Sequence, residues 1–161
     1  MSTPTLELRN LEVAYTVRGI DREVLRNISL SIEPGEAYGL VGESGCGKST
    51  AAYAAMRYLP RNGKITGGSI LFEGRDMVTM SDGEVSELRN SVISMVYQNP
   101  VAALNPTIRV GDQVAEVFEL AGKSKSEAKK LTLEALVRVK IADPEKVMRR
   151  YAHQLSGGMA Q

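Results

Sequence analysis

The chain has 161 residues, with 20 basic and 19 acidic side chains and a formal net charge of +1. That length suits a domain with a real core, and the near balance of charge gives no footprint for nucleic acid or an anionic membrane surface. No stretch approaches the roughly 18 apolar residues of a membrane-spanning helix, and the polar first residues are unlike a secretory signal. A single cysteine, Cys46, agrees with a cytosolic, reducing compartment.

Apolar residues predict two kinds of strand in the first 100 residues. They alternate in Leu6 to Val13, in Ile28 to Ile32 and again at Ile70 and Phe72, which predicts half-buried strands of one antiparallel layer. The runs Tyr38 to Val41 and Val92 to Val96 are apolar without alternation. They predict strands that are buried on both faces.

Two capping-box patterns predict helices. Ser81 with Glu84 should begin a short helix through about Arg89. Ser124 with Glu127 should begin another helix. The apolar face predicted for it consists of Leu131, Ala135 and Val139.

The chain after Pro106 has a helical pattern. One helix is predicted from a shared apolar face of Val110, Val114, Val117 and Phe118. Further along, Asp143 should cap a helix that Pro144 opens at its first position.

A glycine-rich stretch follows the first of the non-alternating runs. It fits the spacing of a phosphate-binding P-loop and reads Gly42-Glu43-Ser44-Gly45-Cys46-Gly47-Lys48-Ser49-Thr50. Glycines let backbone N–H groups converge on phosphate oxygens, and a helix beginning near Gly47 would point its positive end at the same anion. Lys48 would reach the β- and γ-phosphates, Ser49 would ligate Mg²⁺, and Thr50 would bond the α-phosphate side. The stretch therefore predicts a binding site for a nucleotide triphosphate.

Cys46 lies inside this loop and has two interpretations. Its neighbour Lys48 and the helix N-terminus are surroundings that predict a reactive thiol. Alternatively, it is a small residue that fills a position in the loop.

The last residues carry a second motif, Leu155-Ser156-Gly157-Gly158-Met159-Ala160-Gln161. Together with the P-loop it closely resembles the signature motif of ABC-type ATPases, and the resemblance covers essentially the whole chain. Val96-Tyr97-Gln98-Asn99-Pro100 resembles the Q-loop of that family. Ala103-Leu104-Asn105-Pro106 with Gly111-Asp112-Gln113 resembles its peptide and nickel importer branch.

The resemblance implies an α/β fold of the P-loop NTPase class. Residues 1–98 would form an antiparallel β layer and a P-loop core with a partial parallel sheet, and residues 99–161 a helical subdomain that ends in the signature motif. The implied function is that of the ATP-binding subunit of an importer for peptides or similar small solutes, driven by ATP binding and hydrolysis. Its cofactors would be ATP and Mg²⁺.

The resemblance also gives roles to residues outside the P-loop. Tyr15 would stack on adenine, although alone it reads as a tyrosine in the core at the end of a strand. Gln98 would contact Mg²⁺ or orient water, although alone it reads as a surface glutamine. Ser156, Gly157 and Gly158 would bind the γ-phosphate held by the opposite subunit. His153, the only histidine, would not be catalytic, because the family's switch histidine follows the signature.

The implied partners are membrane-spanning permease subunits, a second ATPase subunit in a head-to-tail homo- or heterodimer and, indirectly, a solute-binding protein. No nucleic acid is expected. The chain would be cytoplasmic, peripheral on the inner face of the cell membrane, and the segment Thr107 to Val139 would dock on the permease.

The family's Walker B aspartate, catalytic glutamate and switch histidine cannot be assigned in this sequence. We therefore expect a truncated subunit with weak or absent hydrolysis, because nothing obvious positions the attacking water. We also expect the residues after Gly158 not to complete a helical turn. Two alternatives remain: a nucleotide-binding module without turnover, and a soluble ABC-type ATPase that does not act in transport.

Overall fold

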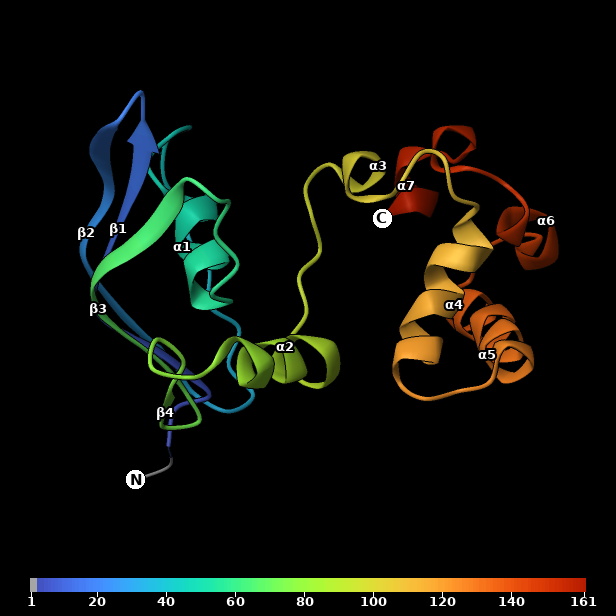
Figure 1. The fold of residues 1–161 in the computed structure, drawn as a ribbon, viewed down its shortest axis with the longest axis horizontal. Helices are drawn as coiled ribbons and strands as arrows, with labels where there is room; N and C mark the ends of the chain where they lie inside the picture. The colour runs from blue at the N-terminus through green and yellow to red at the C-terminus, as the bar shows by residue number, and fades with distance from the viewer. Residues whose placement is uncertain (1–2) are drawn as a thin grey trace. The chain divides into compact units, whose positions relative to one another are not determined.

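A computed structural model describes residues 3–161. The chain separates into two compact units, residues 3–94 and residues 95–161 (Figure 1). The first unit contains the sheet and two helices, and the second consists of helices. The subdomain boundary predicted between residues 98 and 99 lies close to this division.

The first unit contains a four-stranded antiparallel sheet in the order β2-β1-β3-β4. Its strands are β1 (Leu6–Val17), β2 (Ile20–Ile32), β3 (Gly63–Phe72) and β4 (Arg75–Asp76). The first three contain the alternating segments, so the predicted antiparallel layer is confirmed. Both β1 and β2 are longer than the alternation indicated.

Two tight turns explain the additional pairing in the sheet. Arg18 and Gly19 join β1 to β2, and Glu73 and Gly74 join β3 to β4, and all four residues have positive φ. Two-residue turns with positive φ at both positions match the right-handed twist of the strands they connect. They therefore hold Val17 opposite Ile20 and extend the first hairpin beyond its apolar part.

One core lies between the sheet and the first two helices, α1 (Lys48–Ala55) and α2 (Asp82–Ser91). In Figure 1, α1 lies over one face of the sheet. The buried core residues are Leu8, Leu11, Val13, Leu25, Ala51, Ala54, Ile70, Phe72, Met77 and Val85. The helix that follows the P-loop is thus attached to the sheet by this core.

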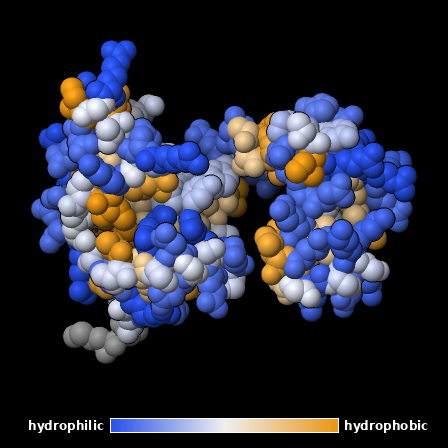
Figure 2. Space-filling view, viewed as in Figure 1, coloured by the Kyte–Doolittle hydropathy of each residue, from blue (hydrophilic) through white to orange (hydrophobic). Residues whose placement is uncertain are grey.

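The prediction of two strands buried on both faces is wrong. Residues 38–41 and 92–96 have no strand structure, and Val41 and Val96 are 99% and 70% exposed. A strand of that kind needs a hydrogen-bonded neighbour on each side. Among residues 3–161 the only sheet is the antiparallel one, so the predicted partial parallel sheet does not form here. Apolar surface, orange in Figure 2, shows on both units.

The capping box at the start of α2 is confirmed. The Ser81 hydroxyl accepts a hydrogen bond from the Glu84 N–H at 3.3 Å, and the Glu84 carboxylate accepts from the Ser81 N–H at 2.9 Å. The backbone hydrogen bond from Ser81, followed by the bond from its hydroxyl, lowers the pKa of Glu84. The box fixes the residue at which the helix begins.

The second unit consists of short helices. They are α3 (Pro100–Ala103), α4 (Val110–Leu120), α5 (Lys125–Arg138), α6 (Pro144–Met148), the 3₁₀ turn η1 (Ala152–Gln154) and α7 (Gly157–Ala160). The capping box of Ser124 and Glu127 at the start of α5 and the first-position proline of α6 are confirmed. Asp143 precedes α6 in a left-handed conformation and makes no side-chain cap bond, contrary to the cap we predicted.

The buried faces of α4 and α5 differ from the predicted ones. On α4, Val110 is buried but Val117 is 61% exposed. On α5, the buried residues are Ala128, Thr132 and Leu136, whereas Val139, predicted on the apolar face, is 67% exposed. The reason is tertiary, because α4 and α6 both pack on α5 and their positions decide which side of it is covered. Thr132 tolerates burial because its hydroxyl donates to the Ala128 carbonyl at 2.8 Å.

Three helices end with the same backbone motif. Arg57 after α1, Gly122 after α4 and Lys140 after α5 have φ of 49°, 83° and 59°. The N–H of each following residue reaches back to a carbonyl of the last turn, as in the bond from Tyr58 N to Tyr53 O at 2.8 Å. This is the Schellman motif, whose left-handed position favours glycine. The left-handed conformation costs a residue with a Cβ about 1–2 kcal/mol of conformational energy.

Candidate functional site

The P-loop leads into α1 through glycines that the local geometry requires. Gly45 and Gly47 have φ of 84° and 96°. A Cβ on Gly47 would lie 2.9 Å from Leu25 Cδ2 and 3.4 Å from the Val24 carbonyl oxygen, so the loop packs closely on β2. A Cβ on Gly42 would lie 2.8 Å from Cys46 Sγ. These positions keep the loop tight and its backbone accessible.

The N-terminus of α1 is suited to an anion. Its first N–H groups belong to Lys48, Ser49 and Thr50, and the first helical hydrogen bond runs from Ala51 N to Gly47 O at 2.8 Å. Gly47 gives no side-chain cap, and the first turn carries no acidic residue. By contrast, α2 and α5 have a glutamate in this turn. The positive end of α1 is therefore not neutralised by its own side chains.

Lys48 brings a formal positive charge to the same loop. Its Nζ donates to the Gly42 carbonyl at 2.8 Å and to the Glu43 carbonyl at 2.5 Å. It also lies 3.4 Å from Cys46 Sγ. The side chain thus curls over the loop, and the ammonium lies where the loop backbone turns.

Ser49 and Cys46 are both exposed. The Ser49 hydroxyl follows Lys48 in the first turn of α1 and is an oxygen ligand of the kind that Mg²⁺ accepts. Among the described residues no cluster of three or more His, Cys, Asp or Glu side chains could hold a metal. A metal here would therefore share its coordination with phosphate and water, which fits the donor set. Both interpretations of Cys46 stay open, because its thiol touches Lys48 and also fills space beside Gly42.

Tyr15 lies near the end of β1, where it pairs with Arg22 and Gly63. It is half-buried and packs against the core. Its ring covers Gly63, where a Cβ would lie 2.8 Å from Tyr15 Cε1. This is the environment of the alternative interpretation, a core tyrosine at the end of a strand. Stacking on adenine stays a prediction.

The second glycine loop forms the start of α7. The Ser156 hydroxyl accepts a hydrogen bond from Met159 N at 3.4 Å, while Gly157 and Gly158 are exposed. Backbone bonds from Ala160 N to Ser156 O and from Gln161 N to Gly157 O, at 2.9 and 3.0 Å, close one helical turn. The expectation that these residues would not complete a turn is therefore wrong. Serine capping is sufficient to begin the turn.

Gln98 and His153 are exposed residues of the second unit. Gln98 immediately precedes Asn99, which caps α3 through a bond from Ala102 N at 3.3 Å. The role of Gln98 toward Mg²⁺ or water stays a prediction. His153 lies in η1 and stacks on Tyr151 with ring centroids 5.8 Å apart.

Sequence reasoning missed two contributions to the P-loop surroundings. Val24 and Leu25, which pack on Gly47, lie in the part of β2 that the apolar alternation did not reveal. The turn residues Arg18 and Gly19 could have indicated this longer hairpin. Arg57, just beyond α1, was also missed, because its conformation and distant contacts leave no local signal.

The fold and the P-loop together define a P-loop NTPase of the ATP-binding cassette class. The family model described as "ABC transporter" matches residues 25–161. The chain therefore belongs to the ABC transporter family, and the resemblance drawn from its sequence is confirmed.

Curated relatives include ATP-binding proteins of peptide transport. The chain is 42% identical over 158 residues to the dipeptide transport ATP-binding protein DppD of Bacillus subtilis (strain 168), covering 97% of this chain and 47% of DppD. It is 41% identical over 157 residues to the oligopeptide transport ATP-binding protein OppD of Salmonella typhimurium (strain LT2), with coverage of 97% and 47%. The chain thus spans about half the length of the curated relatives it matches.

Solved structures share the fold. The dimeric, post-hydrolysis ATP-binding cassette MJ0796, bound to ADP and Pi, superposes with a TM-score of 0.79 at 24% identity, covering 96% of this chain and 65% of MJ0796. The cassette cbiO1 of Clostridium perfringens, part of the cbiONQ transporter complex, gives a TM-score of 0.71 at 26% identity, with coverage of 98% and 58%.

Proposed function

We propose that the chain is an ATP-binding portion of an ABC importer that energises uptake of peptides or similar small solutes. The observation that carries the proposal is the P-loop, where glycines with positive φ, the first turn of α1 and the Lys48 ammonium converge. The relatives named for dipeptide and oligopeptide transport support the choice of solute class.

Different residues of the P-loop would bind different parts of the nucleotide. Backbone N–H groups from Glu43 to Thr50 would surround the phosphates. The Lys48 ammonium would give up a hydrogen bond to a loop carbonyl and donate to a β- or γ-phosphate oxygen instead. Mg²⁺, when bound, would supply positive charge that offsets the charge of the phosphates. Ser49 would hold the metal through its hydroxyl.

The site would be completed by a second ATPase subunit. Ser156, Gly157 and Gly158 would face the γ-phosphate held by the opposite subunit, and Gly157 and Gly158 leave their backbone exposed for such a contact. A dimeric arrangement is named for the MJ0796 structure. Turnover by residues 1–161 alone should be weak, since the catalytic glutamate expected of the family cannot be assigned in this sequence.

The permease subunits would dock on the helical unit. A cavity of about 830 Å³ lies between α4, α5 and α6, with Ala115, Leu133 and Met148 contributing apolar surface. Charged side chains of both signs surround it: Arg109, Lys125, Lys129, Lys130, Arg149, Asp112, Glu119 and Glu145. A cavity lined by both apolar and charged side chains suits a short helical segment of a partner. Among the described residues, no helix is long and apolar enough to cross a bilayer.

Calorimetric titration with Mg-ATP tests the proposal, with phosphate release followed in the same sample. We expect saturable binding that requires Lys48, and little phosphate release. Absence of binding by the folded chain would contradict the proposed nucleotide site. Lys48-dependent turnover would instead show that residues 1–161 position the water without the expected glutamate.

A further inference from the structure

Arg57 occupies an unusual position just beyond α1. It is the left-handed residue of the Schellman motif that ends the helix, with φ of 49°. Its N–H reaches the Ala54 carbonyl at 2.7 Å. Glycine is favoured at this position because a Cβ is strained there. Arg57 adopts this conformation although it is not glycine, and, unlike Lys140 at the same position after α5, it uses its side chain for long-range contacts.

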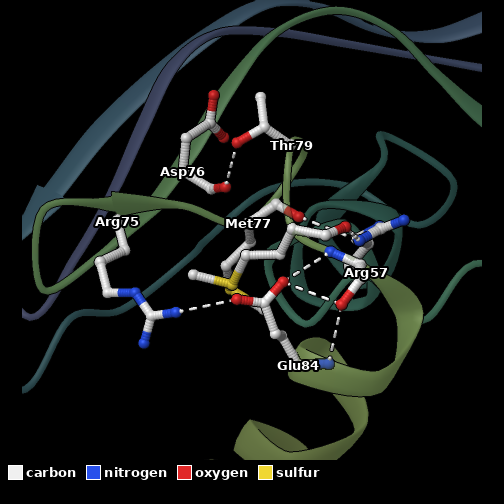
Figure 3. Close-up of polar contacts among 8 residues, drawn as sticks. Arg57, Arg75, Asp76, Met77, Thr79 and Glu84 are labelled. Carbon is white, nitrogen blue, oxygen red and sulfur yellow. Dashed lines mark hydrogen bonds and ion pairs between the residues drawn. The ribbon is translucent and has the colours of Figure 1, made fainter.

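The guanidinium of Arg57 makes those contacts with a distant part of the chain. It donates to the Met77 carbonyl at 3.1 Å and to the Met80 carbonyl at 2.5 Å. It also forms an ion pair with Asp82 at 2.9 Å. Figure 3 shows the Arg57 side chain reaching this segment between β4 and α2. The Arg57 side chain is only 26% exposed, whereas that of Asp82 is 98% exposed, so the carbonyl bonds are the stronger part of the contact.

The segment that receives Arg57 is itself held firmly. Met77 is fully buried in the core, and its N–H donates to the Ile70 carbonyl of β3 at 2.7 Å. The Asp76 carboxylate accepts from Val78 N at 3.0 Å, and Thr79 Oγ1 donates to the Asp76 carbonyl at 2.9 Å (Figure 3). Arg57 therefore connects the end of α1 to a segment that is itself hydrogen-bonded to β3.

The core contacts of α1 itself are made by small side chains. Its buried residues are Ala51 and Ala54 alone, and its first turn has no side-chain cap. Two alanines restrain a helix less than larger apolar side chains do, because they bury little surface. The Arg57 contacts at its other end therefore add a restraint on the orientation of α1.

We propose that Arg57 is a positioning residue for the P-loop: it fixes the direction of α1 and thereby the placement of Lys48 and Ser49. The proposal rests on the proposed nucleotide site, because it assigns Arg57 an indirect role in binding there. Arg57 touches no part of the P-loop in the described contacts and acts through α1.

The decisive variant is Arg57→Gly, which removes the guanidinium and at the same time relieves the strained backbone. Lys140→Gly is the matched control, because Lys140 occupies the same left-handed position after α5 and no described side-chain hydrogen bond or ion pair involves it. Arg57→Lys retains a charged donor in reach of the carbonyls. Two quantities are measured on the whole chain: the Kd for Mg-ATP under conditions where each variant is fully folded, and amide hydrogen exchange of residues 48–55 without nucleotide.

We expect Arg57→Gly to weaken Mg-ATP binding by about tenfold, the scale of a small misplacement of binding groups, and to speed exchange in α1. Lys140→Gly should change neither, and Arg57→Lys should recover part of both. Unchanged α1 exchange in Arg57→Gly would overturn the proposal, as would unchanged affinity where the wild type binds. If the wild type binds no Mg-ATP, the proposed function fails, and the placement of Lys48 and Ser49 by Arg57 fails with it.

Discussion

The two glycine loops of this chain resemble each other in sequence but differ in how their helices begin. Lys48 opens an eight-residue helix that has no side-chain cap, and its ammonium lies over the loop. Gly157 opens a four-residue helix whose first turn is capped by the Ser156 hydroxyl. The first loop has a positive charge and uncapped amides. In the second loop, the Ser156 hydroxyl accepts a hydrogen bond from the backbone of its own helix.

This difference indicates separate tasks for the two loops. The first loop has glycines with positive φ, and Gly47 packs on β2. This packing favours one loop shape, which suits tight binding of a phosphate chain. At the signature loop, a Cβ on Gly157 or Gly158 would meet nothing within 4 Å. That open surface suits contact with a group presented by another molecule.

Lys48→Ala should give the largest effect and would separate the loops most clearly. Loss of a charged donor to phosphate is expected to cost about 2–3 kcal/mol, which is roughly 30- to 150-fold in Kd for Mg-ATP. Calorimetry measures this change in Kd. The control is Lys129→Ala, which replaces an exposed lysine of α5. Equal affinity in Lys48→Ala and wild type would remove the distinction between the loops.

Exchanging glycine for alanine in each loop comes next. Gly47→Ala should destabilise the chain by about 1–2 kcal/mol, because alanine is strained at a φ of 96° and its Cβ would press on Leu25. Gly157→Ala should be neutral within about 0.5 kcal/mol, because its Cβ would enter open space. Thermal unfolding of both variants gives the comparison, and similar losses would contradict it.

Ser156→Ala should have a smaller, local effect. Removing the cap is expected to lower the local stability of α7 by about 0.5–1 kcal/mol. Amide exchange at Ala160 and Gln161, whose N–H groups close the helical turn, would report it. Ser49→Ala should leave the stability of α1 nearly unchanged, since Gly47 rather than Ser49 precedes that helix. Protection of α7 that survives in Ser156→Ala would show that the hydroxyl is not what begins the turn.

The pH dependence of stability should be the smallest effect, and among the helices it belongs to the capped ones rather than to α1. Hydrogen bonds from Ser81 and Ser124 lower the pKa values of Glu84 and Glu127. A lowered pKa in the folded state means that the carboxylate stabilises the fold above the ordinary value of about 4.3. This contribution is lost as the pH falls through the lowered pKa.

Urea midpoints measured between about pH 6 and pH 3 would show this loss. Glu84→Gln retains an acceptor for the capping box but does not titrate in this range. It should therefore show a weaker dependence on pH than the wild type. An identical dependence would mean that the Glu84 box contributes little.

Local motifs were predictable from sequence. The capping boxes beginning at Ser81 and Ser124 formed as expected, and Gly47 and Lys48 begin α1 as the P-loop pattern indicates. Each of these depends on residues within a few positions of one another, so the chemistry is readable from their spacing.

Tertiary structure decided the features that depend on distant neighbours. The apolar runs ending at Val41 and Val96 were predicted as strands, yet residues 3–161 give them no hydrogen-bonded partner. Likewise, the packing of α4 and α6 selected the Thr132 face of α5, which apolarity alone would not choose.

The sequence by itself thus determined the antiparallel layer, the two glycine loops and the residues that begin the helices, because short-range hydrogen bonds and alternation specify them. Only the tertiary structure decided that Gly47 packs on Leu25 and that Arg57 reaches Met77 and Met80. Those contacts join residues 20 or more positions apart. Such pairs come into contact only when the sheet and α1 form their common core. Local sequence patterns therefore do not predict these contacts.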